Sequence, residues 1–271
     1  MLVDSHCHLD RLDLTPYGND FSRCIRRTLS CGIHHLLCVS ISLDKYTVMR
    51  DMVDPFPEIS VSVGVHPNEK VVNEPDMDSL AELARDTRVV AIGETGLDYF
   101  RADGDLRWQQ ERFRTHVRAA IRIGKPLIIH TREARADTLR ILKEERAESV
   151  GGVLHCFTED WQTAKEAMDL NFYISFSGIL TFKNAMQIQD VARKMPGERL
   201  LVETDAPYLA PVPMRGKPNY PEYVRHVASC LGELRGSRLE EIADLTTANY
   251  FKLFSASRDH TGIPQTTTSG F

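Results

Sequence analysis

Six side chains able to bind metal ions each lie at or just past the end of a short apolar run. They are His6 and His8 after residues 1–3, Glu94 after 89–93, His130 after 127–129, His155 after 153–154, and Asp205 after 200–204. Side chains so far apart in the sequence converge only if the runs are neighbouring parallel strands whose carboxyl ends open on one cavity. Barrel enzymes carry their active sites at that end. The pattern therefore predicts an α/β fold with one site at the strand ends.

The apolar runs alternate with amphipathic stretches along the chain. We expect eight strands, at residues 2–4, 36–39, 59–65, 89–93, 127–129, 152–154, 172–176 and 200–203. The clearest helix pattern spans 105–123 and stops at Gly124. Another helix is expected from Ser237, whose Ser-Arg-Leu-Glu segment is typical of a capping box. An eightfold alternation favours a (β/α)8 TIM barrel over an open doubly wound sheet.

Length and composition fit one domain. The chain has 271 residues, 42% of them hydrophobic, and shows no internal repeat or change in composition. After about residue 257 the periodicity fades into sequence rich in Thr and Ser. We therefore predict a barrel domain over 1–256 and a mobile C-terminal tail over 257–271.

Charge and cysteine usage bear on location and partners. No apolar stretch of about 18 residues is present, and the N-terminus has no signal-peptide features, so no membrane partner is expected. The six cysteines lack CxxC pairs, which predicts reduced thiols and a cytoplasmic location. We also expect a monomer. A formal net charge of −5 means that a polyanionic substrate must be held by local cations and bound metal.

The first pair of ligand candidates has the period of a strand. His6 and His8 should share one face, while Cys7 points the other way into packing. A single histidine such as His130 or His155 could equally orient a substrate by hydrogen bonding. Together, however, four imidazoles and two carboxylates in a dry cavity need a cation to satisfy them.

The ligand types limit the metal. Nitrogen and oxygen ligands without thiolate suit Zn or Mn, and the carboxylates keep Mg possible. Six ligands are too many for one catalytic tetrahedral ion but about right for two divalent ions bridged by a carboxylate. Glu94 is the expected bridge. His6, His8 and Asp205 would complete one site, and His130 with His155 the other.

Six blocks carry a family resemblance. They are Val-Asp-Ser-His-Cys-His-Leu-Asp at 3–10, Gly-Val-His-Pro at 64–67, Gly-Glu-Thr-Gly-Leu-Asp-Tyr at 93–99, Pro-Leu-Ile-Ile-His-Thr-Arg at 126–132, His-Cys-Phe at 155–157 and Glu-Thr-Asp-Ala-Pro-Tyr at 203–208. In this order and spacing the chain resembles the TatD family of metal-dependent deoxyribonucleases. The resemblance implies an amidohydrolase-like barrel, a two-metal site and phosphodiester hydrolysis. Glu94 stands where many amidohydrolases carry a carboxylated lysine, which favours the nuclease branch.

Further positions match the family. The resemblance makes His66 a phosphate contact, with a loop histidine stacked on Pro67 as the alternative. Asp98 is expected to orient a ligand imidazole or to cap a loop. Arg132 could hold a phosphate or pair with a nearby glutamate. Glu203 is expected to hydrogen-bond a ligand or substrate. Arg215 and Asn219 belong to a loop that resembles the family's RGxxNxP loop and would bind phosphate or form a structural turn.

The expected reaction is a hydrolysis in which a hydroxide between two ions attacks phosphorus and Asp205 accepts its proton. Both Asp205 and Glu94 would then act in catalysis. The expected substrate is the 3′ end of DNA, single-stranded or frayed. Alternatives on the same site are a D-aminoacyl-tRNA deacylase, a hydrolase of a small amide or phosphate metabolite, and a non-enzymatic nucleic-acid binder. The shape and charge of the barrel mouth would separate them.

Overall fold

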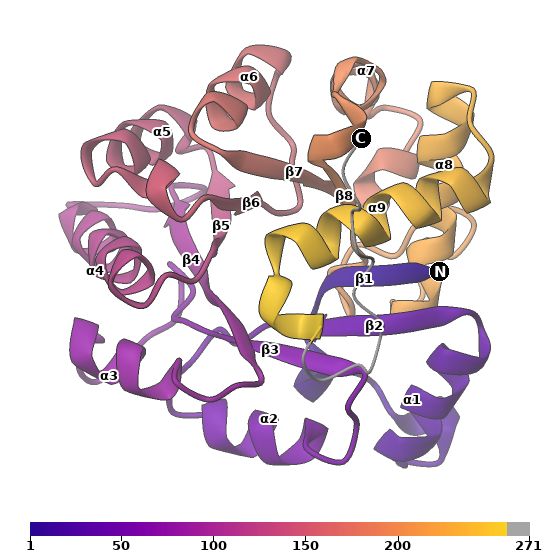
Figure 1. Cartoon of the computed structure of the whole chain (residues 1–271), viewed down its shortest axis with the longest axis horizontal. Helices are drawn as coiled ribbons and strands as arrows, with labels where there is room; N and C mark the ends of the chain where they lie inside the picture. Colours follow the sequence, from indigo (N-terminus) through magenta and orange to yellow (C-terminus); the bar gives the residue numbers. More distant parts are fainter. Residues whose placement is uncertain (259–271) are drawn as a thin grey trace, which may run out of the picture.

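Eight parallel strands follow one another around a single sheet in sequence order, and one or two helices follow each strand (Figure 1). The structure is a computed structural model and describes residues 1–258. The strands are β1 Leu2–Cys7, β2 Ile33–Cys38, β3 Ile59–Val63, β4 Val89–Asp98, β5 Leu127–Arg132, β6 Gly152–Leu154, β7 Phe172–Phe176 and β8 Leu200–Val202. The helices are α1 Phe21–Ser30, α2 Tyr46–Val53, α3 Met77–Leu83, α4 Arg107–Ile123, α5 Arg135–Glu144, α6 Trp161–Asp169, α7 Met186–Lys194, α8 Val224–Arg235 and α9 Leu239–Leu253.

The sheet closes into a barrel just beyond the last strand. The Asp205 backbone N–H donates to the His6 carbonyl at 3.0 Å, and the His8 N–H donates to the Ala206 carbonyl at 2.8 Å. These bonds join the segment after β8 to β1. The predicted single-domain (β/α)8 barrel is therefore confirmed, and residues 6, 8 and 205 lie beside one another.

The strand boundaries refine the predicted ones. β1 runs to Cys7, β4 to Asp98 and β5 to Arg132, so His6, Glu94 and His130 lie inside their strands. The apolar pattern of these strands stops before the strands themselves end, because the inward-facing positions near the strand ends are polar. The 105–123 helix is confirmed as α4, which ends at Gly124 with φ 67°.

The predicted capping box at Ser237 is wrong. The Ser237 N–H donates to the Gly232 carbonyl at 2.9 Å, which makes this residue part of the C-terminal turn of α8. α9 starts at Leu239 instead, and the Glu241 carboxylate accepts the Arg238 N–H at 2.9 Å. The box is thus shifted by one residue, because Gly236 and Ser237 are already used to end the preceding helix.

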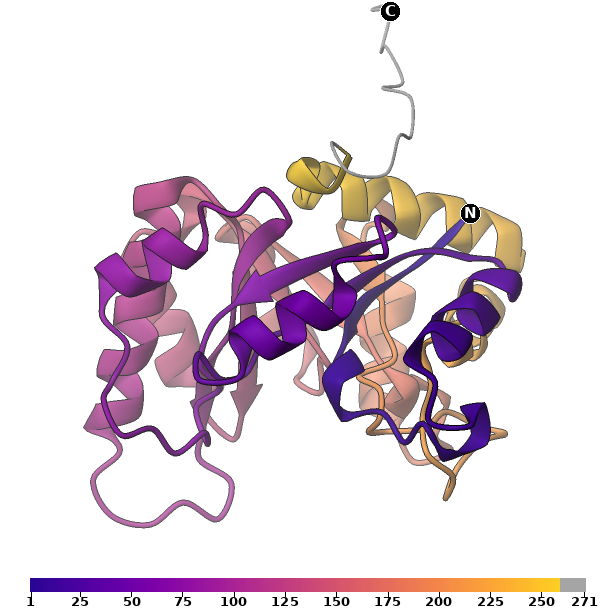
Figure 2. The same ribbon diagram turned by 90° about the horizontal axis from the view of Figure 1, so that it is seen from below.

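α9 covers the amino-terminal end of the barrel, and the loops that carry the site lie at the opposite end (Figure 2). Tyr250 and Phe254 are fully buried against inward-facing strand residues such as Val3 and Leu37. Ser257 is also buried and accepts a hydrogen bond from Ser60 Oγ at 3.1 Å, so the packed chain reaches this residue. The rest of the predicted tail, from 259 to 271, lies outside the described residues. Within residues 1–258, no helix is long and apolar enough to cross a membrane.

Candidate metal centre

The six predicted ligands converge at the carboxyl end of the barrel around one buried carboxylate. Glu94, on β4, is 2% exposed and lies between the histidines at the end of β1 and those at the ends of β5 and β6. Its Oε2 is 3.5 Å from His6 Nε2 and 3.6 Å from His8 Nε2. Its Oε1 is 2.8 Å from His155 Nε2 and 3.1 Å from His130 Nδ1. The two oxygens thus face two different pairs of imidazoles, as a bridging ligand requires.

Asp205 completes the first half of the centre. Its Oδ1 is 3.4 Å from His8 Nε2 and 3.7 Å from His6 Nε2. Nε2 of His6 and Nε2 of His8 are themselves 3.3 Å apart. That separation suits two neighbouring ligands of one tetrahedral ion with bonds of about 2.0–2.1 Å. His6, His8 and Asp205 therefore form one group that could hold an ion, while Glu94 Oε1 lies beside His130 and His155.

Hydrogen bonds on the outer side of the rings fix which nitrogen faces the centre. His8 Nδ1 lies 3.0 Å from the Val39 carbonyl, so it carries the proton and donates. His130 Nε2 donates to Asp98 Oδ2 at 3.0 Å. Each inward nitrogen then keeps its lone pair, which is the form a metal ligand needs. The orienting role predicted for Asp98 matches this geometry.

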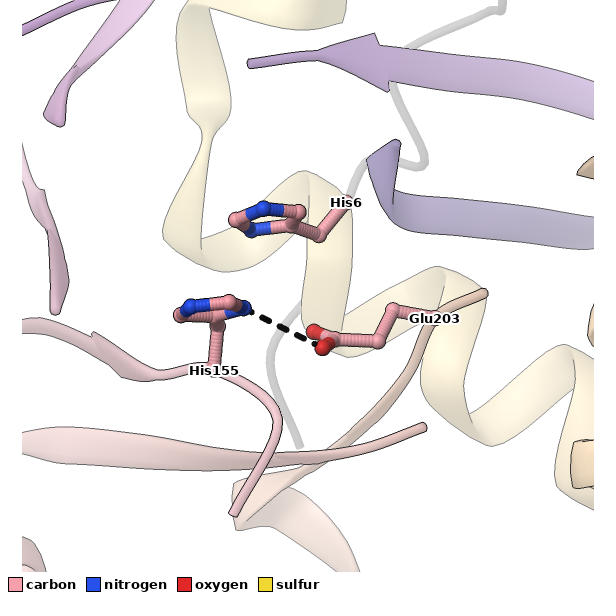
Figure 3. A group of neighbouring side chains, drawn as sticks. All are labelled: His6, His155 and Glu203. Atoms are coloured by element: carbon pink, nitrogen blue, oxygen red, sulfur yellow. Dashed lines mark hydrogen bonds and ion pairs between the residues drawn. The ribbon is translucent and has the colours of Figure 1, made fainter. Parts of the chain in front are cut away.

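His155 is fixed in the same way by a second buried carboxylate. Its Nδ1 donates to Glu203 Oε1 at 3.3 Å (Figure 3). Glu203 is fully buried and also accepts the Cys156 N–H at 2.8 Å. This contact is one of those expected for Glu203, a hydrogen bond to a ligand.

The electrostatics of the cluster favour cations. Burial alone would lower the pKa of His130 and His155, but the neighbouring carboxylates outweigh it and raise both pKa values. Burial would likewise raise the pKa of Glu94, but the imidazoles, His155 foremost, hold it well below its usual range. The pocket therefore has a negative potential that protonated imidazoles or metal ions can balance. Metal binding would displace those protons.

His66 faces the centre as a hydrogen-bond donor. Its Nε2 is 3.5 Å from Glu94 Oε1, while its Nδ1 accepts the Asn68 backbone N–H at 3.0 Å. Burial lowers the pKa of His66 to about 4, so the ring is neutral near pH 7. With Nδ1 accepting, the single ring proton sits on Nε2. His66 is thereby suited to donate to a substrate oxygen and unsuited to bind metal through Nε2.

Sequence reasoning missed Arg112, which supports the His66 loop from α4. Its Nη1 donates to the backbone carbonyls of His66 at 3.0 Å and Glu69 at 2.9 Å, and its Nε and Nη2 bind the Glu74 carboxylate. One signal was available. Arg112 and His116 lie one turn apart on the apolar face of this helix, and a polar side chain in such a stripe needs a buried partner.

Gly96 lets β4 lie close to its neighbour β5. Gly96 has φ +137°, and a Cβ built there would lie 2.0 Å from the His130 carbonyl oxygen. Any residue larger than glycine at position 96 would therefore collide with β5. That close approach sets Glu94 beside His130.

A cavity of about 490 Å³ opens above the ligands. Besides metal-centre residues, it is lined by His66, Thr131, Arg132, Cys156, Thr158 and the apolar group Ile41, Ile179, Tyr208 and Leu209. The Arg132 guanidinium stacks on Phe100, 3.6 Å from the ring centre. Tyr208 is 47% exposed and meets the His8 ring edge-on. The mouth thus combines one cation with an exposed aromatic ring.

Two predicted substrate contacts lie outside this lining. The Arg215 guanidinium stacks on Phe182 at 3.9 Å. Asn219 is fully buried, and its side chain donates to the carbonyls of Thr204 and Tyr208 at 2.9 and 2.5 Å. Asn219 therefore supports the loop that carries Asp205, and direct contact with a substrate would require this loop to move. Cys7, as expected, packs in the hydrophobic core.

Comparisons with known proteins identify the family and agree with the fold. A sequence model of the family described as "TatD related DNase" matches residues 3–255. The chain is 50% identical over 254 residues to the "uncharacterized metal-dependent hydrolase YcfH" of Escherichia coli K12, covering 93% of this chain and 95% of that protein. It is 29% identical over 249 residues to the "3'-5' ssDNA/RNA exonuclease TatD" of Klebsiella pneumoniae, covering 90% and 95%. The crystal structure of YJJV, a TatD homologue from E. coli K12, superposes with a TM-score of 0.85 at 28% identity over 94% of this chain and 98% of that one.

Proposed function

The chain belongs to the TatD-related DNase family and is a metal-dependent hydrolase, and from that premise we propose that it removes nucleotides from the 3′ end of single-stranded DNA with two divalent ions. The observation that carries the two-ion part is Glu94, whose two oxygens face separate pairs of imidazoles at 2.8–3.1 Å and 3.5–3.6 Å. Mg, Mn and Zn all suit this ligand set.

The cavity supports a strand end as the substrate. Its volume of about 490 Å³ lies within the range of sites that enclose one small ligand. One terminal nucleotide fits such a volume, whereas a nucleotide inside a duplex would first have to leave its stack, at a cost of a few kcal/mol. Tyr208 offers a surface for a base, and Arg132 offers a planar fork for a phosphate. The Klebsiella pneumoniae relative named as an ssDNA/RNA exonuclease supports the same substrate class.

Each residue has a task in the reaction. Bound divalent ions would supply a water of lowered pKa and stabilise negative charge on oxygen. Asp205, which lines the cavity, accepts the proton of the water whose oxygen bonds to phosphorus. The P–O3′ bond to the preceding nucleotide breaks, and the released 3′ oxygen takes up a proton from Asp205 or from water. His66 donates its Nε2 proton in a hydrogen bond to a phosphoryl oxygen, and Arg132 binds an oxygen of the same or the next phosphate.

Binding should rest on few contacts. With a net charge of −5, the protein has no positive field to attract DNA over distance. Affinity should therefore be weak and fall steeply with salt. A monomer in the cytoplasm completes the proposal, and the six cysteines, all free, are consistent with a reducing compartment.

The test compares single-stranded oligonucleotides labelled at the 5′ end, one with a free and one with a blocked 3′ hydroxyl end, at fixed Mg or Mn. We expect stepwise shortening of the free strand alone and none with Asp205→Asn. Cleavage of both strands at internal positions would contradict an exonuclease. Deacylation of a D-aminoacyl-tRNA without any shortening of DNA would instead assign the site to ester hydrolysis.

A further inference from the structure

Three buried polar atoms at the metal centre have no hydrogen-bond partner among residues 1–258: Nε2 of His155, Nδ1 of His6 and Oε2 of Glu203. Nε2 of His155 faces Glu94 Oε1 at 2.8 Å as a candidate ligand atom, which leaves His6 Nδ1 and Glu203 Oε2 to be explained. Both residues are fully buried. A buried donor or acceptor left without a partner is destabilising, so two such atoms on neighbouring residues point to a shared contact.

The two residues are brought together by His155 (Figure 3). The His6 and His155 rings stack with centroids 3.9 Å apart and planes 8° from parallel. Glu203 lies beside this stack and accepts from His155 Nδ1 through Oε1. One nitrogen or oxygen atom from each of the three residues lies within 4.8 Å of the others.

The tautomer of the His6 ring determines how His6 and Glu203 can be linked. Nε2 of His6 faces His8, Glu94 and Asp205, so a His6 that binds metal there carries its proton on Nδ1. That N–H is a donor, and the free Glu203 oxygen is an acceptor. A water that bridges two atoms with bonds of about 2.8 Å spans roughly 4.6 Å. One ring nitrogen of His6 and one carboxylate oxygen of Glu203 lie within 4.8 Å of each other, a separation that one such water can span. A metal ion fits less well, because His155 Nδ1 already carries a proton and cannot bind it.

We propose that Glu203 positions one ligand of each ion at once: His155 by a direct hydrogen bond, and His6 through one buried water. His6 belongs to the half of the centre with His8 and Asp205, and His155 to the half with His130. Glu203 would therefore link the two halves. Asp98, by contrast, contacts only His130 among the ligands. This inference rests on the two-ion part of the proposed function and is independent of the DNA substrate.

The first test measures metal affinity in Glu203→Gln and in Asp98→Asn as the matched control. Each metal-free protein is titrated with Zn in the presence of a competing chelator, which gives two dissociation constants. Loss of an orienting partner weakens metal binding by about 10–100-fold. We expect Glu203→Gln to weaken both constants and Asp98→Asn only one. Weakening of a single constant by Glu203→Gln would overturn the proposal. If the unaltered protein bound fewer than two ions, the two-ion function would fail with it.

A second test uses the unaltered protein and does not depend on whether a variant folds. In the zinc-loaded, unaltered protein with ¹⁵N-labelled histidine, the His6 ring should be the Nδ1–H tautomer with a slowly exchanging proton that shows a cross-peak to bound water. The His155 ring should also be the Nδ1–H tautomer, without such a cross-peak. A His6 proton on Nε2, or one that exchanges as fast as an exposed histidine, would overturn the proposal.

Discussion

Replacing Arg112 by methionine tests how the protein holds His66 in the site. The arginine side chain is 3% exposed. Its Nη1 satisfies the carbonyls of His66 and Glu69 at 3.0 and 2.9 Å, and a third, of Pro67, at 3.3 Å. Methionine fills much of the same volume but donates no hydrogen bond. The perturbation therefore removes the hydrogen bonds of this loop to α4 without opening a large cavity.

The magnitude follows from these contacts. Glu74 is 51% exposed, so its ion pair with Arg112 is screened by water and adds little. The two shorter carbonyl contacts dominate, at about 1–3 kcal/mol each if the carbonyls stay buried. Because the loop can partly relax toward water, we expect a loss of about 2–4 kcal/mol in the free energy of unfolding. If His66 donates to the transition state, its displacement should also lower kcat/KM by about 10–100-fold, below the 10²–10³-fold of a lost oxyanion donor.

The assay is urea unfolding together with kcat/KM on a single-stranded oligonucleotide. Arg118→Met is the control, because Arg118 lies on the same helix, is 53% exposed and bonds Glu145 alone among residues 1–258. Its loss should stay within about 0.5 kcal/mol. Equal losses in the two variants, or a folded Arg112→Met with unchanged kcat/KM, would refute the reasoning about the His66 loop.

Three further predictions concern pH, backbone packing and metal. Burial lowers the pKa of His116 from 6.5 to about 4, so the neutral ring stabilises the fold above pH 6.5 and this stability is lost as the pH falls toward 4. His116→Gln should therefore reduce the acid-induced loss in the free energy of unfolding by about 3 kcal/mol, measured by unfolding at several pH values. An unchanged pH profile would contradict this. Gly96→Ala places a Cβ 2.0 Å from the His130 carbonyl oxygen, so it should lower the melting temperature and weaken metal binding at one site. A normal metal content would show that the backbone of β4 can shift to make room for the methyl group. Removing metal with a chelator should lower the melting temperature of the unaltered protein and of Cys7→Ser by the same amount, since Cys7 packs away from the site. A lower metal content in Cys7→Ser would contradict this placement of Cys7.

The sequence predicts the convergence of the candidate ligands well because metal ligands need particular side chains, and those side chains interrupt apolar strands at recognisable places. The convergence of His6, His8, Glu94, His130, His155 and Asp205 follows from strand order alone. The supporting contacts are harder to predict. Arg112 acts through backbone carbonyls that carry no sequence signature, and Asn219 resembles a polar loop residue although it is buried.

Local signals also compete in ways that one sequence does not rank. Ser237 is a good helix-capping residue by type, but its N–H is already bonded to Gly232 at the end of α8. Arg215 follows the last strand and suggests a phosphate contact, yet in the structure its guanidinium lies on Phe182. Which partner such a residue takes depends on loop geometry, which is set by contacts far away in the sequence.

The central claim is that Glu94 bridges two ions, and electron paramagnetic resonance of the protein loaded with two equivalents of Mn²⁺ tests it most directly. Ions bridged at about 3.5–4 Å are exchange-coupled. We predict a coupled two-manganese spectrum for the unaltered protein and its loss in Glu94→Gln, in which an NH2 group replaces one of the two oxygens that face the histidine pairs and the negative charge is removed. A spectrum of two independent Mn²⁺ ions in the unaltered protein, or a coupled spectrum that survives Glu94→Gln, would contradict the account.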